Sequence, residues 1–215
     1  MGLTVFGRAT SSNVQTVMWG AAELGIPVDR LDYGFNFGGT DSPEFKAMSP
    51  HGLVPVLRDG DTVIWESCAI LRYLAAQYGD GGAFWPADPG ARSRVDMWAE
   101  WGKTTLISTL INQVFWPLVR MAADERDPVA VDAGIAKVGR LLEVLGDQIA
   151  GDFILGDTLT LADVVIGNIL FRWFTLEIDR PANAAVEAYY DRLTKRPAFA
   201  EHVMVDYSIL RHPEA

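Results

Sequence analysis

The chain has 215 residues, of which 49% are hydrophobic, so it can bury a substantial core and is globular rather than disordered. Its 18 lysines and arginines stand against 28 aspartates and glutamates, which gives a net charge of −10. No dense basic run interrupts this acidic balance. Because a nucleic-acid-binding surface needs such a basic footprint, we set that class of function aside.

The sequence carries no sign of a targeting segment or of a disulfide framework. The N-terminus lacks a basic stretch followed by an apolar one, and no uncharged apolar run reaches the roughly 18 residues of a membrane span. We therefore expect a soluble, cytoplasmic protein without membrane contact. The single cysteine, Cys68, excludes an internal disulfide and a Cys-x-x-Cys pair, and we interpret it as a small core residue.

The first 40 residues alternate β-like runs with helical spacing. Residues 3–6 predict a strand, and the apolar residues that follow recur at helical intervals until Gly25. Pro27 then restarts the chain, residues 28–33 predict a second strand, and residues 34–40 form a glycine-rich loop. Together these elements predict a β-α-β unit.

A hairpin follows this unit. Residues 43–48 predict a short helix, and two strand-like runs at 52–57 and 62–65 flank a predicted turn at Asp59-Gly60, because Asp-Gly tolerates the positive φ angles of tight turns. Residues 66–78 then carry apolar side chains on one helical face. The expected fold of this part is α/β, a small mixed sheet with helices on both sides.

The sequence predicts helices throughout the second part of the chain. Residues 79–89 are rich in glycine and proline, and we interpret them as a linker. Beyond them, helical periodicity predicts an all-α bundle with helices at residues 91–122, 128–150, 161–176 and 182–193. Pro117 lies inside the first of these stretches and is expected to kink or interrupt it.

The third of these helices begins with a recognisable cap. Thr160 precedes Asp163 by three residues, which is the spacing of a capping box, and Leu159 and Val164 occupy the positions of a hydrophobic staple. The helix that follows is apolar around most of its circumference and should be central in the bundle. We therefore interpret Asp163 as a structural residue and not as a catalytic acid.

The candidate chemistry lies at two helix starts. Ser11-Ser12-Asn13 precedes the first helix and Glu66-Ser67 the third, and unpaired N–H groups at a helix start favour an anion such as a carboxylate or thiolate. The three histidines are far apart, and we expect no metal site; phosphate-loop patterns are also missing from the sequence. Composition alone makes the bond before Pro55 trans.

Three segments carry a resemblance to a known family. They are Ser49-Pro50-His51-Gly52-Leu53-Val54-Pro55-Val56-Leu57, Asp59-Gly60-Asp61, and Glu66-Ser67-Cys68-Ala69-Ile70-Leu71-Arg72-Tyr73-Leu74. In this order they resemble the glutathione-site signature of cytosolic glutathione S-transferases of the serine type, theta- or nu-like, and residues 159–164 resemble that family's C-terminal capping motif. The resemblance implies a thioredoxin-like domain at residues 1–80, an all-helical domain at 88–215, and a homodimer.

The resemblance also implies where glutathione, the co-substrate, would bind. It implies a cis bond between Val54 and Pro55, with the Val54 N–H and C=O turned toward the cysteinyl backbone of glutathione. Glu66 would pair with the ligand ammonium group and Ser67 with the γ-glutamyl carboxylate. His51 is one candidate for the glycyl carboxylate, and an exposed loop histidine is the alternative.

Family members place a hydrogen-bond donor for the glutathione sulfur just after the first strand. A serine hydroxyl does not ionise itself, but as a donor it stabilises the thiolate and lowers the thiol pKa from about 8.5 toward neutrality. Alignment with serine-type classes, and with bacterial disulfide-bond reductases, favours Ser11 as donor, Asn13 as a second donor and Ser12 as the helix cap. Ser12 is the alternative candidate for the donor.

Three functions are compatible with these observations. The first is a transferase that conjugates glutathione to a hydrophobic, electrophilic small molecule; the second is a glutathione-dependent disulfide reductase; the third is a non-catalytic binding module. For the first, the electrophile would bind between the domains. Its expected wall consists of Trp98, Trp101, Phe115, Trp116 and Arg120.

Overall fold

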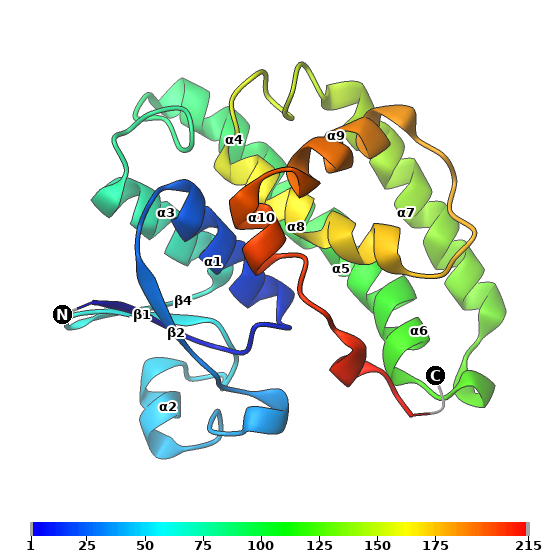
Figure 1. Ribbon diagram of the computed structural model, residues 1–215, viewed down its shortest axis with the longest axis horizontal. Coiled ribbons are helices and arrows are strands. Elements are labelled where there is room, and N and C mark those ends of the chain that lie inside the picture. Colours follow the sequence, from blue (N-terminus) through cyan, green and yellow to red (C-terminus); the bar gives the residue numbers. More distant parts are fainter. Residues whose placement is uncertain (1, 214–215) are drawn as a thin grey trace.

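The computed structural model describes residues 2–213, and its first part is built on a four-stranded mixed sheet (Figure 1). The strands are β1 (Leu3–Phe6), β2 (Val28–Leu31), β3 (Val56–Asp59) and β4 (Thr62–Trp65). Their order is β2-β1-β3-β4, with β2 parallel to β1 and the other pairs antiparallel. The parallel pair is joined through a helix, as the predicted β-α-β unit requires.

The hairpin differs from its prediction by one residue. Asp59 pairs with Thr62, so the two-residue turn consists of Gly60 and Asp61, and only Gly60 has a positive φ, of 55°. Asp59 ends β3 instead, where its carboxylate accepts hydrogen bonds from the Tyr73 and Tyr78 hydroxyls. β3 also begins later than expected, because Pro55 has no N–H to donate to the ladder.

Helices cover both faces of the sheet, as predicted. The helices α1 (Ser12–Glu23) and α3 (Ser67–Tyr78) pack on the face that carries Leu3, Val5 and Leu57. The opposite face presents Phe6 and Val56 to Phe45 of the short helix α2 (Pro43–Met48). Alternate residues of β1 thus belong to different cores, which is the period-two pattern of a strand buried on both sides.

The second part consists of helices joined by loops, as expected, and within the described residues it contributes no strand to a sheet. Its longer helices are α4 (Pro89–Trp101), α7 (Pro128–Gln148), α8 (Leu161–Thr175) and α9 (Ala184–Thr194), and the short helix α10 (Pro197–His202) follows them. Short 3-10 turns occupy Ala123–Glu125 and Ser208–Leu210 in this part, and Phe35–Phe37 in the first part. In Figure 1, α1 and α3 lie between the sheet and the helical part. Among the described residues, none of the helices has the length and apolarity that crossing a membrane requires.

The helical run that begins with α4 does not break at Pro117. It continues through a π-helical segment (Gly102–Ile107), α5 (Ser108–Leu110), a second π-helical segment (Ile111–Phe115) and α6 (Trp116–Arg120). A proline removes one N–H and crowds the preceding turn, and the wider π turn directly before Pro117 accommodates it. The helical run is therefore not interrupted at Pro117. Its pattern changes from π-helical to α-helical directly before this proline.

Asp163 caps the start of α8 and has a structural role. Its carboxylate accepts hydrogen bonds from the Thr160 N–H at 2.7 Å and the Thr160 hydroxyl at 2.8 Å. The N–H of Ile154 and the hydroxyl of Tyr189 donate to its other oxygen, at 2.9 and 3.0 Å. Asp163 is fully buried, and burial raises its pKa while the four donors act in the opposite direction. The predicted capping role is confirmed.

Helix α1 belongs to both parts of the molecule. Val14, Val17 and Ala21 pack with the sheet, whereas Trp19 on another face lies in the large core of the helical part. Glu23, at the end of α1, accepts hydrogen bonds from the indole of Trp19 at 2.8 Å and from the guanidinium of Arg196 at 2.7 Å. Apolar packing and an ion pair therefore join the helix to both parts.

Candidate active site

The loop after β1 places Ser11 at the start of α1. Ser11 occupies the N-cap position, with φ −83° and ψ 120°, but its side chain makes no capping hydrogen bond. Ser12 is already the first helical residue, so the expectation that Ser12 is the cap is wrong. Neither hydroxyl has a hydrogen-bond partner among residues 2–213, whereas the Ser12 carbonyl accepts bonds from Thr16 and Asn168. Ser11 is buried to 9% exposure.

A lysine from the helical part joins the starts of α1 and α3. The Lys103 ammonium donates to Asn13 Oδ1 at 2.7 Å and to Ser67 Oγ at 3.1 Å. Ser67 Oγ in turn lies 3.5 Å from the same Asn13 oxygen. Sequence reasoning missed Lys103, although a lysine in an otherwise mostly apolar and polar-uncharged stretch, 101–119, was a signal that it serves a particular partner.

Lys103→Met is expected to weaken glutathione binding about tenfold, because the variant keeps the apolar stem and removes charge-assisted hydrogen bonds that hold the two helix starts together. Titration calorimetry with glutathione measures this effect. Lys137→Met, at an exposed position of α7, removes the same charge elsewhere and serves as control. Equal affinities of the two variants would show that Lys103 has no part in the site.

The segment before β3 offers free main-chain groups. The Val54–Pro55 peptide bond is cis, as the resemblance implies. Neither the N–H nor the C=O of Val54, which lies just outside β3, has a hydrogen-bond partner within the described part of the chain. An extended ligand can therefore pair with Val54 in the manner of an added strand.

Glu66 and Ser67 form the start of α3. Glu66, with φ 71°, occupies the N-cap position, but its side chain makes no capping hydrogen bond. Ser67 is buried, with 2% of its surface exposed. His51 lies nearby: its Nδ1 is 2.8 Å from Ser49 Oγ, and its Nε2 is 3.7 Å from Glu66 Oε1. The His51 ring also packs on Trp65 at 4.8 Å between centroids. His51 is thus placed beside Glu66.

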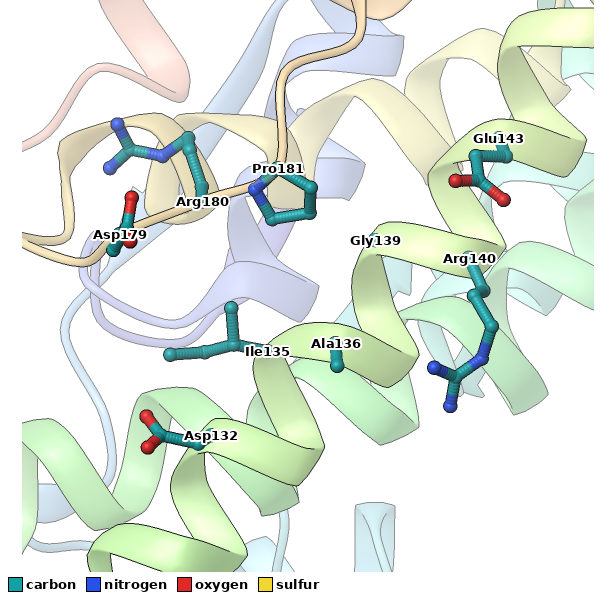
Figure 2. A pocket seen from close by; sticks show the side chains of 9 residues that line it. All are labelled: Asp132, Ile135, Ala136, Gly139, Arg140, Glu143, Asp179, Arg180 and Pro181. Carbon is teal, nitrogen blue, oxygen red and sulfur yellow. The ribbon is translucent and has the colours of Figure 1, made fainter.

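The two parts of the chain enclose a cleft beside the start of α1, and Glu66, Ser67 and His51 are not among its lining residues. It has a volume of about 460 Å³, and its lining includes Ser11, Ser12, Asn13, Val54, Lys103 and Trp116. Hollows of about 540 and 520 Å³ exist elsewhere. Figure 2 shows the first of them, where the sides of α7 and the segment 179–181 present a mixture of opposite charges. Neither contains a residue expected in the glutathione site, whereas Ser11, Ser12, Asn13 and Val54 line the cleft between the two parts.

Comparisons with known proteins agree with this geometry. Residues 1–76 match the family model "Glutathione S-transferase, N-terminal domain", and residues 128–201 match "Glutathione S-transferase, C-terminal domain". The chain is 34% identical over 209 residues to glutathione S-transferase GstB of Escherichia coli (strain K12), covering 96% of this chain and 100% of that relative. The chain belongs to the glutathione S-transferase family. Its fold class and its membership of this transferase family, both expected from the sequence, are thereby confirmed.

The chain is also similar to glutathione S-transferases of the theta class. The theta class enzyme from Xanthomonas axonopodis pv. citri with glutathione bound has a TM-score of 0.88 and 36% identity, covering 95% of this chain and 98% of that one. Glutathione S-transferase theta-2B of Homo sapiens is 32% identical over 171 residues, covering 77% of this chain and 69% of the relative. The similarity to the bacterial enzymes extends over both parts of the transferase.

The structure brings only some of the expected acceptor-wall residues to the cleft of the transferase. Trp116 lines it, and the guanidinium of Arg120 lies 4.1 Å from the centre of the Trp116 ring. Phe115 is 0% exposed and belongs to the core, with its ring 5.0 Å from that of Trp116 between centroids. Trp98 and Trp101 pack edge to face against each other and the same core, and they do not line the cleft.

Two arginines that the sequence prediction omitted do line the cleft of the transferase. Arg8 comes from the loop after β1, and Arg172 from α8. A signal for Arg172 existed, since an arginine among the apolar residues of a central helix needs a specific environment. Cys68, by contrast, lies in the core, where burial raises the pKa of its thiol, in agreement with its interpretation as a core residue.

Proposed function

We propose that this enzyme binds glutathione along Val54 and the start of α3, and joins the glutathione sulfur to an electrophilic carbon of a small molecule in the same cleft. The Val54 N–H and C=O pair with the cysteinyl residue of the tripeptide. Glu66 pairs with the γ-glutamyl ammonium group, while the Ser67 hydroxyl and N–H receive the neighbouring carboxylate. His51, beside Glu66, contacts the glycyl carboxylate.

The observation that carries this proposal is the unengaged Ser11 hydroxyl at the start of α1. A serine in the N-cap position ordinarily accepts a hydrogen bond from its own helix, and here it does not. Its hydroxyl is therefore available to donate to the glutathione sulfur, with the first N–H groups of α1 adding partial positive charge. Asn13 is the second donor, through its amide nitrogen, because Lys103 and Ser67 already donate to its oxygen.

The reaction follows from this arrangement. Donation from Ser11 stabilises the thiolate over the thiol, so a larger fraction is ionised at neutral pH. The sulfur electron pair forms a bond to the electrophilic carbon, the bond from that carbon to its leaving group breaks, and the leaving group departs with the bonding pair. Trp116, with Arg120 stacked on it, forms the wall beside the electrophile.

Steady-state turnover of two substrates tests the proposal. A transferase consumes a chloronitrobenzene in the presence of glutathione, whereas a disulfide reductase, the alternative that Ser11-x-Asn13 resembles, reduces a small disulfide. We expect turnover of the chloronitrobenzene. Turnover of the disulfide alone would favour the reductase, and retention on a glutathione column without either activity would indicate a non-catalytic binding module.

We also propose a cytoplasmic homodimer as the working form. Glutathione is the thiol that keeps the cytosol reducing, so its supply favours that compartment. A homodimer is implied by the family resemblance. Light scattering measures the mass in solution directly, and a mass of one chain would contradict the dimer.

A further inference from the structure

The cleft carries positive charge that no neighbouring carboxylate balances. Among its lining residues, Arg8, Lys103 and Arg172 are cationic, and none is an aspartate or glutamate. Lys103 is engaged at the glutathione end by Asn13 and Ser67. Within the described part of the chain, no ion pair forms at Arg8 or Arg172. The two arginines that line the cleft, Arg8 and Arg172, therefore have no counter-ion within the described residues.

The guanidinium of Arg172 is buried, and its hydrogen bonds in the described part of the chain go to neutral groups. The residue is 2% exposed, and its guanidinium donates to the Thr10 carbonyl at 2.8 Å and to Gln15 Oε1 at 3.3 Å. Its Nε is buried without a hydrogen-bond partner among residues 2–213, and the Phe115 ring lies 5.0 Å away. Burial, together with the charge of Arg8, lowers its pKa to about 10. A buried cation without a counter-ion is costly, so an anion beside it would be stabilised.

Arg8, which lines the cleft, and Arg120 both lie against the ring of Phe35. Their guanidinium carbons lie 5.4 and 4.9 Å from the centre of the Phe35 ring, and Arg120 also lies over Trp116. Phe35 has φ 54°, a conformation that a bulky side chain adopts only when its surroundings impose it. The Nε of Arg8 is buried and unpaired, and burial and Arg120 together lower the Arg8 pKa.

We propose that the cleft takes an electrophile that carries a carboxylate, bound by Arg8 and Arg172, with Arg120 nearby on the ring of Trp116. The inference rests on the proposed function and adds the charge of the substrate to it. Arginine suits this task because its planar fork binds a carboxylate through two parallel hydrogen bonds. With a halogenated acid, the sulfur forms a bond to the carbon beside the carboxylate, and halide leaves with the electron pair of the broken bond.

Iodoacetate and iodoacetamide form a matched pair of probes. They share the reacting carbon, the leaving group and nearly the same size, and they differ in charge. For each probe, kcat/KM with glutathione is divided by the rate constant of the uncatalysed reaction. We expect this normalised value to be about tenfold higher for iodoacetate, the effect of one charge-assisted contact. A normalised value that is equal or lower for iodoacetate overturns the inference.

Variants of Arg8 test whether the preference for iodoacetate over iodoacetamide arises in the cleft. Arg8→Gln should reduce the preference for iodoacetate about tenfold, and Arg8→Lys should retain part of it. Arg140→Gln, at an exposed position of α7, makes the same change in net charge and should keep the preference. If Arg8→Gln lowers turnover of both probes equally, Arg8 serves glutathione or the fold, and the inference is wrong.

A binding measurement separates this inference from the proposed function. S-carboxymethylglutathione and its amide are the two products, and calorimetry gives their affinities without any turnover. We expect tighter binding of the carboxymethyl compound, by about tenfold. Turnover of a chloronitrobenzene with equal affinity for both products overturns the carboxylate site alone. Absence of all turnover overturns the proposed function, whereas tighter binding of the carboxymethyl product would still support the site.

Discussion

Replacing Ser11 with alanine is expected to lower kcat/KM for a chloronitrobenzene by about 100-fold, the usual loss when one preorganised donor to a developing or stabilised anion is removed. The thiol of bound glutathione should become harder to ionise in the variant. The ultraviolet absorbance of the bound thiolate, followed against pH, measures this directly. Because the Ser11 side chain makes no capping bond, the variant loses no helix cap and its stability should hardly change.

Ser12→Ala is the matched control for this experiment. Ser12 is adjacent, also lines the cleft, and also has an unengaged hydroxyl among the described residues, but it lies inside the helix. We expect a much smaller loss of activity and an unchanged thiolate titration. A large loss in Ser12→Ala with normal activity in Ser11→Ala would assign the donor to Ser12. Normal activity in both would refute a serine donor.

Asp163→Ala is expected to lower the free energy of unfolding by about 3–5 kcal/mol, because several buried donors lose their acceptor at once. Two of these donors are the main-chain N–H groups of Ile154 and Thr160, and a third is the hydroxyl of the fully buried Tyr189. Urea unfolding followed by circular dichroism measures the change. Asp163→Asn should also be destabilised, since its amide nitrogen would face an N–H donor.

Asp147→Ala provides the comparison for the buried aspartate. Asp147 is exposed near the end of α7, and a surface substitution of this kind ordinarily changes stability by less than about 0.5 kcal/mol. Coinciding unfolding midpoints for the Asp147 and Asp163 variants would mean that the hydrogen bonds of Asp163 are replaced by water without loss. The structural role assigned to Asp163 would then be wrong.

Local patterns predicted the elements of the fold well. The strand Leu3–Phe6, the helix Pro43–Met48 and the strand Thr62–Trp65 have the expected bounds. The capping box was readable because its partners are three residues apart. The π-helical turns before Pro117 were not, because a π turn depends on how the surrounding helices pack and leaves little trace in apolar spacing.

The site was predictable only where its residues come from one segment. Glu66 and Ser67 are neighbours in the sequence, and their motif located them. Lys103 is 90 residues from Asn13 and 36 from Ser67, so their contact follows from the packing of the two parts. Arg172 likewise reaches Thr10 across 162 residues. Single-sequence patterns carry no information about such pairs.

The aromatic wall shows a different source of error. Spacing placed Phe115 and Trp116 in the same helical stretch, but adjacent helical residues point about 100° apart, so only one of them faces the cleft. Trp98 and Trp101 were assigned by their chemistry rather than by the face they occupy. Residue type alone does not distinguish a substrate wall from a core.

Because α1 packs with both cores through different faces, a hybrid enzyme made by joining the first half of this chain to the second half of a relative would need compatible contacts on that helix. Trp19 would meet foreign side chains, and Glu23 would need an equivalent of Arg196. A mismatch would tilt or shift the helix whose first turn presents Ser11. Recombination between relatives should therefore preserve activity most often when the crossover transfers α1 together with the helices that surround Trp19.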